Sequence, residues 1–107
     1  MAKFYALGNY TTQGFQGFCK DPGSDRSKAE QIAADAVGAK MVSFSGLRGS
    51  YDFLAVFEGD FAQGAGIKMA TEASGTLCNL TILEEINLND VAAHAAKIAQ
   101  KYKGVGQ

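Results

Sequence analysis

The pattern of apolar and polar positions along the chain predicts four strands. Residues 4–10 are aromatic and apolar with one glycine, which is typical of a strand. Residues 40–47 and 51–58 have the pattern of two strands, and the turn between them at 48–50 contains a glycine that supplies the positive φ of a tight hairpin. A fourth strand is predicted over residues 76–86.

Helix signals fill the intervals between these strands. A first helical stretch begins at the threonines at 11–12 and is interrupted by the Pro-Gly pair at 22–23. A second helix is capped by Ser24 or Asp25 and ends at Gly38, a typical C-terminal stop. Two helical segments therefore connect the first and second strands.

The second half of the chain predicts two more helices. Asp60 followed by Gln63 resembles a capping box for a short helix that ends at residue 73. A last helix begins at residues 87–89, after the fourth strand. Its apolar face comprises Val91, Ala95, Ile98 and Tyr102.

The order of these elements predicts an α+β fold of the ferredoxin-like type. A βαββαβ order with right-handed crossovers gives a four-stranded antiparallel sheet in the order 4-1-3-2, with both crossover helices on one face. The additional C-terminal helix completes a single domain over residues 1–103, and residues 104–107 are expected to form a short tail.

The third predicted strand indicates how the sheet is covered. Residues 53–57 are apolar at every position, whereas a strand with one face in water should alternate. Both faces must be covered, and the crossover helices cover one. We therefore expect a homodimer or a higher homo-oligomer in which two sheets pack face to face. The alternative is that the C-terminal helix folds back over the open face of its own sheet.

Composition excludes several kinds of partner. The 107-residue chain is 47% hydrophobic, and ten basic residues are matched by eleven acidic ones, which gives a net charge of -1. A surface for nucleic acid or anionic membranes would show an excess of lysine and arginine. No apolar run approaches the roughly 20 residues of a membrane helix. We expect a cytoplasmic protein with no nucleic-acid and no membrane partner.

Neither a metal nor a cofactor is expected. Cys19 and Cys78 are far apart in the sequence and lack a CxxC spacing, so we expect two reduced and mostly buried thiols. The single histidine, His94, is on the last helix and has no evident second ligand.

Four short motifs occur in register along the chain: LGNYT at residues 7–11, KDP at 20–22, GSYD at 49–52 and ASG at 73–75. Together they resemble the GYD domain family, which is named after its G-x-Y-D turn, over roughly residues 3–86. The resemblance implies a small bacterial protein with the fold of the dimeric α/β barrel superfamily, in agreement with the expected dimer. It implies no particular activity.

The predicted topology brings polar residues of these motifs to one edge of the sheet, because the ends of strands one and two meet the starts of strands three and four. The free N–H groups of the first helix also make this edge attractive to an anion. The candidate ligand-binding residues are Asn9, Tyr10, Thr11, Arg48, Tyr51, Asp52 and Ser74.

These residue types suit the mouth of a small-molecule pocket. Arg48 would bind an anion, Tyr10 and Tyr51 would form hydrogen-bonding walls, and Asn9 would orient the ligand. Asp52 would act as a base or as the ion-pair partner of Arg48. The alternative is structural, with threonine as a helix cap, aspartate satisfying turn amides and tyrosines in an interface.

Three functions from different classes follow. The first is a homodimeric binding module for a small anionic or aromatic metabolite. The second is a cofactor-independent enzyme of the monooxygenase or isomerase kind, with Asp52 or Tyr51 as base, which is supported by analogy at the level of the fold. The third is a structural or regulatory oligomer without a ligand. The sequence leaves open whether the protein catalyses a reaction.

Overall fold

The computed structural model describes residues 2–104 and 106. Within these residues the elements are, in chain order, β1 (Ala2–Tyr10), α1 (Thr12–Lys20), α2 (Arg26–Ala36), β2 (Lys40–Gly46), β3 (Phe53–Gly59), α3 (Phe61–Ala73), β4 (Leu77–Glu84) and α4 (Leu88–Lys101). The predicted α+β, ferredoxin-like arrangement is confirmed. Two residues of the predicted tail, 105 and 107, lie outside the described residues.

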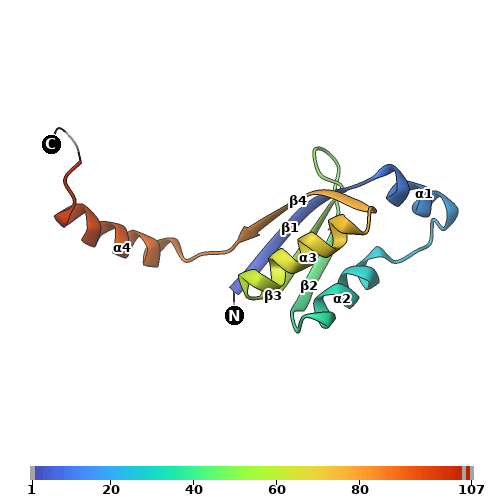
Figure 1. Cartoon of the computed structure of the whole chain (residues 1–107), viewed down its shortest axis with the longest axis horizontal. Helices are drawn as coiled ribbons and strands as arrows, with labels where there is room; N and C mark the ends of the chain where they lie inside the picture. The colour runs from blue at the N-terminus through green and yellow to red at the C-terminus, as the bar shows by residue number, and fades with distance from the viewer. Residues whose placement is uncertain (1, 105, 107) are drawn as a thin grey trace.

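The four strands form one antiparallel sheet in the order β2-β3-β1-β4 (Figure 1). This is the predicted order 4-1-3-2 counted from the other edge. The β2–β3 connection covers residues 47–52 and is longer than predicted, because β3 begins at Phe53. A hydrogen bond of 2.9 Å from the N–H of Leu47 to the carbonyl of Asp52 closes this connection.

The helices α2 and α3 cover one face of the sheet (Figure 1). Ala6 of β1 and Ala55 of β3 pack in one core cluster with Ala34 of α2 and Ile67 of α3. Ala34 and Ala55 are completely buried. Because these contact residues are small, α2 lies close to the sheet.

Local capping follows the sequence. Thr11, Asp25 and Asn87 cap α1, α2 and α4 through their side-chain oxygens. Asp60 and Gln63 form the predicted capping box of α3, with hydrogen bonds of 2.8 Å in both directions. The helix starts are therefore fixed by signals that lie within a few residues of each start.

The opposite face of the sheet is covered by none of the described helices (Figure 1). Side chains alternate along a strand, so Leu54 and Val56 of β3 lie on this face beside Leu7 and Tyr5 of β1. Leu83 of β4 pairs with Tyr5 and is half exposed. These five residues define what we call the open sheet face.

The last helix, α4, extends away from the sheet (Figure 1). All of its residues are exposed, including Val91 and Ile98 of the predicted apolar face. The alternative in which α4 folds back over its own sheet is therefore wrong. Both α4 and the open sheet face remain without an intramolecular partner among the described residues.

Candidate functional site

The predicted site residues gather at one edge of the sheet. The N–H of Asp52 donates to the carbonyl of Gly8 at 2.8 Å, and the N–H of Thr11 donates to the carbonyl of Thr76 at 3.1 Å. These bonds join the end of β1 to the segments before β3 and β4. Because neighbouring side chains on a strand point to opposite faces, however, four of the seven predicted residues are divided between two separate hollows, Asn9 and Tyr51 in one and Tyr10 and Ser74 in the other.

Asn9 and Tyr51 lie on the open side of this edge. The side-chain amide of Asn9 donates to the carbonyl of Ser50 at 3.1 Å and to the carboxylate of Asp52 at 3.2 Å. The hydroxyl of Tyr51 is 3.3 Å from that of Thr81. Asn9 and Tyr51 help to line a shallow hollow of about 420 Å³ that contains no charged side chain.

Asp52 has contacts that suit a structural role. Its Oδ2 atom accepts hydrogen bonds from the backbone N–H of Tyr10 at 2.9 Å and from the amide of Asn9. Arg48 is exposed, forms no ion pair with Asp52 and lines neither hollow. The carboxylate of Asp52 therefore satisfies donors at the end of β1, whereas the structural alternative expected it to satisfy amides of the turn.

Thr11 and Ser74 also tie backbone segments together. The hydroxyl of Thr11 caps α1 and donates to the carbonyl of Gly75 at 2.6 Å. The hydroxyl of Ser74 donates to the carbonyl of Thr71 at 2.6 Å and lies 2.9 Å from the hydroxyl of Thr76. These bonds hold the end of α3 against the start of α1.

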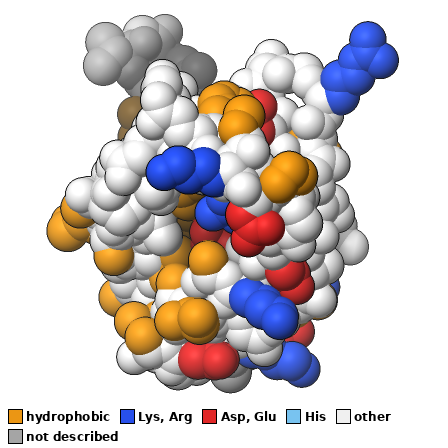
Figure 2. All heavy atoms as spheres, turned by 90° about the vertical axis from the view of Figure 1, so that its right-hand side faces the viewer, with side chains coloured by type: hydrophobic (Ala, Val, Ile, Leu, Met, Phe, Trp, Pro, Cys, Tyr) orange, Lys and Arg blue, Asp and Glu red, His pale blue; other side chains and the backbone are white. Residues whose placement is uncertain are grey.

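A second hollow lies on the helix-covered side, and we call it the helix-side cavity. It measures about 220 Å³ and lies between the end of β1, α1, α2, the end of α3 and the start of β4. Figure 2 faces the end of the molecule that carries α1 and α2, where acidic, basic and hydrophobic side chains surround a hollow. The polar residues that line the cavity are Tyr10, Arg26, Glu30, Thr71, Ser74 and Thr76.

Glu30 is the most unusual residue of this cavity. The residue is only 7% exposed, yet its carboxylate makes no hydrogen bond and no ion pair with the described residues. Burial raises the pKa of its carboxyl above the ordinary value of 4.5. Its oxygens are not among the side-chain atoms that are cut off from solvent without a partner, so the carboxylate faces the cavity and is available to a ligand there.

Arg26 lies one helical turn before Glu30 on α2 but forms no ion pair with it. Its guanidinium carbon is 4.2 Å from the centre of the Phe18 ring, a cation–π contact with α1. Its Nε atom is buried and has no hydrogen-bond partner. The cavity thus holds an unpaired acceptor and an unsatisfied donor that do not meet each other.

Tyr10 forms the aromatic wall of the cavity. Its ring makes edge contacts with Phe15 and Phe18 of α1, at 5.8 and 5.1 Å between ring centres. Burial, followed by the negative charge of Glu30, raises the pKa of Tyr10 to about 12. Its hydroxyl therefore stays protonated at neutral pH and remains a hydrogen-bond donor.

Sequence reasoning found Tyr10 and Ser74 of this cavity but missed Glu30 and Arg26. One signal was available, because Glu30 stands four residues before Ala34 and so shares its helical face. Ala34 is completely buried in the core. The spacing therefore relates Glu30 to Ala34, and the burial of Ala34 in the fold identifies their shared face as the inward one.

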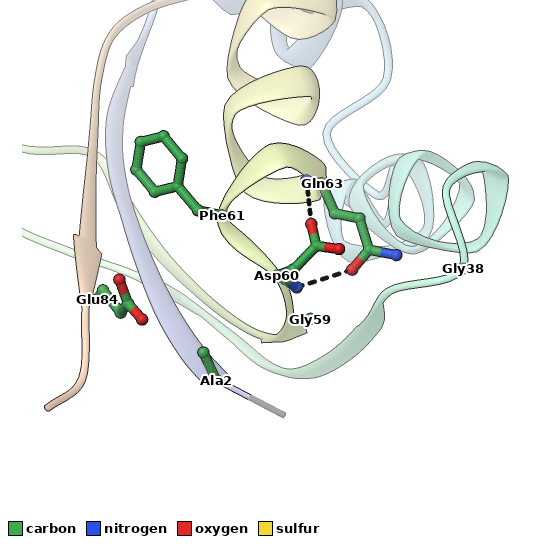
Figure 3. Close-up of a pocket in the computed structure, with 7 residues that line it drawn as sticks. All are labelled: Ala2, Gly38, Gly59, Asp60, Phe61, Gln63 and Glu84. Carbon is green, nitrogen blue, oxygen red and sulfur yellow. Dashed lines mark hydrogen bonds between the residues drawn. The ribbon is translucent and has the colours of Figure 1, made fainter. Parts of the chain in front are cut away.

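A third hollow, of about 370 Å³, lies at the opposite end of the sheet (Figure 3). Asp60 and Gln63 point toward each other there as the capping box of α3. Gln63 also donates to the carbonyl of Val37 at 2.7 Å. Its amide and the Asp60 carboxylate are thus occupied by structural bonds, which makes this hollow a weaker candidate than the helix-side cavity.

Other kinds of site find no support in the described part of the chain. It contains no cluster of three histidine, cysteine or acidic residues that could hold a metal ion, and none of its helices is long and apolar enough to cross a membrane. His94 is exposed on α4. Cys19 is also exposed, so the prediction of two mostly buried thiols is wrong for Cys19, which lies on the outer side of α1.

Comparison with known proteins places the chain in a family. No curated protein and no solved structure matches it significantly. The sequence model of the GYD domain matches residues 4–95, which is most of the 107-residue chain and includes the segments around the helix-side cavity. The chain therefore belongs to the GYD domain family.

Proposed function

We propose that the protein is a homodimeric binding module for a small metabolite and that the ligand occupies the helix-side cavity. The observation that carries this proposal is Glu30, a largely buried residue that lines the cavity and whose carboxyl group has no hydrogen-bond or ion-pair partner among the described residues. Perturbed, unpaired ionisable groups in cavities are typical of functional sites. A ligand that donates a hydrogen bond to Glu30 would supply the missing partner.

The lining also suggests the chemistry of the ligand. Tyr10 and Arg26 offer hydrogen-bond donors, and the ring of Tyr10 belongs to an aromatic cluster with Phe15 and Phe18. A volume of about 220 Å³ equals roughly seven liquid water molecules at about 30 Å³ each. We therefore expect a small molecule that combines an aromatic or apolar part, a hydroxyl or amine donor and a carbonyl or anionic acceptor.

The expected dimer is supported by the open sheet face. Leu54 and Val56 belong to the continuous apolar run of β3 but lie on the side that no described helix covers. A contiguous apolar surface of this kind is typical of an interface. Val56 is already only 8% exposed, and packing of two open sheet faces around a twofold axis would bury the exposed parts of Leu54, Leu7 and Leu83.

Ligand binding is tested by screening a metabolite set for compounds that raise the melting temperature, after native mass spectrometry of the purified protein for a retained ligand. A ligand of the wild type should lose most of its effect in Glu30→Gln and Tyr10→Phe. Glu84→Gln is the matched control, because Glu84 is exposed and lines the hollow at the other end. A ligand whose binding survives Glu30→Gln unchanged would contradict the proposal.

One observation favours catalysis as a second candidate. Burial raises the pKa of Glu30, and a carboxylate with a raised pKa is a better general base near neutral pH. In this case the module would transfer a proton within its ligand, as an isomerase does. Glu30→Gln would then abolish turnover, and Glu30→Asp would retain part of it. Equal turnover by Glu30→Gln and the wild type would exclude Glu30 as the base.

A further inference from the structure

We propose that α4 is an exchanged arm, whose apolar stripe packs on the body of a second copy of the chain. The stripe consists of Val91, Ala95, Ile98 and Tyr102, which recur at helical spacing. Ile98 and Tyr102 are 61% and 68% exposed, and α4 buries none of its residues on its own body. The inference rests on the homodimer proposed above and adds a second contact to it.

The connection before α4 directs the helix away from its own sheet. The N–H of Glu85 donates to the carbonyl of Lys3 at 2.8 Å, and its carboxylate accepts a hydrogen bond of 2.6 Å from the hydroxyl of Tyr5. Asn87 caps α4 only two residues later. With Glu85 held in this way, α4 extends away from its own sheet (Figure 1), so its apolar stripe is free to meet a second copy.

Charge also favours contact between copies. Of the ten basic and eleven acidic residues, three basic ones and Asp90 follow residue 87, so this segment has a net charge of +2. The preceding body keeps seven basic and ten acidic residues, a net charge of −3. These opposite charges attract an arm to any body of this chain, and because α4 extends away from its own body, they would contribute to association with a second copy in low salt.

The area of the interface provides a third argument. Four strands spaced about 4.8 Å apart and about seven residues long offer roughly 450 Å² on each copy, or about 900 Å² for two packed sheets. A specific dimer commonly buries about 1,600 Å². A 14-residue helix is about 21 Å long and 10 Å wide. Two arms, counted together with the two surfaces that they would cover, therefore add roughly 800 Å² of buried area. Sheets and arms together reach the size that the sheets alone do not.

The test compares dimer dissociation constants of the full chain by analytical ultracentrifugation. Ile98→Glu places a charge in the apolar stripe and should raise the dissociation constant at least about tenfold. Gln100→Glu adds the same charge on the opposite face of α4 and should change it by less than about twofold. Leu54→Glu should abolish the dimer, because it charges the open sheet face. Circular dichroism checks that each variant is folded.

The outcomes distinguish the proposed contact of the arm from the sheet-to-sheet contact of the dimer. If Leu54→Glu dissociates the dimer but Ile98→Glu does not, the arm is excluded and the sheet interface stands. Both the arm contact and the dimer are overturned if the wild type is monomeric at all concentrations or binds a different polypeptide in native mass spectrometry. Hydrogen exchange gives a second readout, since α4 amides should be protected only at concentrations at which the dimer forms. Protection that does not depend on concentration would indicate that α4 folds back instead.

Discussion

Replacing Glu30 with glutamine should make the ligand-free protein more stable at neutral pH. Glu30 is 7% exposed as a residue, its carboxyl group accepts no hydrogen bond from the described residues, and burial raises the pKa of that group. Glutamine has nearly the same shape but no charge to desolvate. Most substitutions of buried residues destabilise a protein, so a gain in stability would be a specific signature of an unpaired buried acid.

The size and pH dependence of this gain follow from proton linkage. The pKa of Glu30 is higher in the folded protein than the ordinary value of 4.5, so its contribution to stability is complete below pH 4.5 and is lost as the pH rises through the folded pKa. A buried polar group without a partner typically costs about 1–3 kcal/mol, and a charged one costs more than an amide. We therefore expect Glu30→Gln to gain about 1 kcal/mol at pH 7, or roughly 4 °C in melting temperature.

The assay is urea unfolding of both proteins at pH 4, 5.5 and 7. The advantage of Glu30→Gln should grow with pH and vanish at pH 4. Glu72→Gln is the matched control, because the Glu72 carboxylate accepts hydrogen bonds from the amine of Lys68 at 2.7 Å and the N–H of Leu80 at 3.0 Å, and these lower its pKa. That variant should lose stability at pH 7 and approach the wild type as the pH falls. A loss of stability in Glu30→Gln at pH 7 would refute the view that Glu30 has no partner.

Three further predictions concern residues around the site. Asp52→Ala removes the acceptor of two donors on β1 and should lower the free energy of unfolding by about 1–3 kcal/mol. Asp52→Asn keeps an acceptor oxygen and should lose less. Equal losses in the two variants would mean that the acceptor is unimportant. Gly14→Ala should destabilise by about 1–3 kcal/mol, because its Cβ would lie 2.5 Å from a backbone oxygen. A Cβ added at Gly66 would meet open space, so Gly66→Ala should stabilise the protein by up to about 1 kcal/mol in the same denaturation assay. If Gly14→Ala proved more stable than Gly66→Ala, the packing around α1 would be contradicted. A thiol reagent should modify exposed Cys19 faster than partly buried Cys78, as followed by mass spectrometry.

The parts of the fold that could be predicted are those set by local chemistry. Thr11, Asp25, Asp60 and Asn87 each cap a helix, and a short polar side chain before an amphipathic run is enough to identify such a cap. The strand order then follows from the sequence of elements and the handedness of crossovers. No long-range contact has to be known for these two steps.

The candidate site was harder to predict because it depends on which face each side chain occupies. Asn9 and Tyr10 are neighbours on β1 and therefore line different hollows. Tyr51 precedes β3 in an irregular connection, so strand periodicity could not assign its face, and only the contact with Thr81 does. Glu30 looks like an ordinary polar helix residue until α1 and the end of α3 close around it.

Two features of this chain lower the stability of the isolated protein, and they lie in different parts of the molecule. Inside, the carboxyl group of Glu30, a largely buried residue, has no partner among the described residues. Outside, apolar side chains are exposed at Leu83 of the open sheet face and along the stripe of α4. Such departures are expected where function requires them, since selection retains a local cost only when something offsets it. If a ligand offsets the cost of Glu30 and a second copy of the chain offsets the cost of the exposed apolar surfaces, ligand binding and dimer formation can be disrupted separately. Glu30→Gln should then leave the dimer intact, and Ile98→Glu should leave the ligand affinity of the folded chain intact. Loss of ligand binding in Ile98→Glu would mean instead that the cavity is completed only in the dimer.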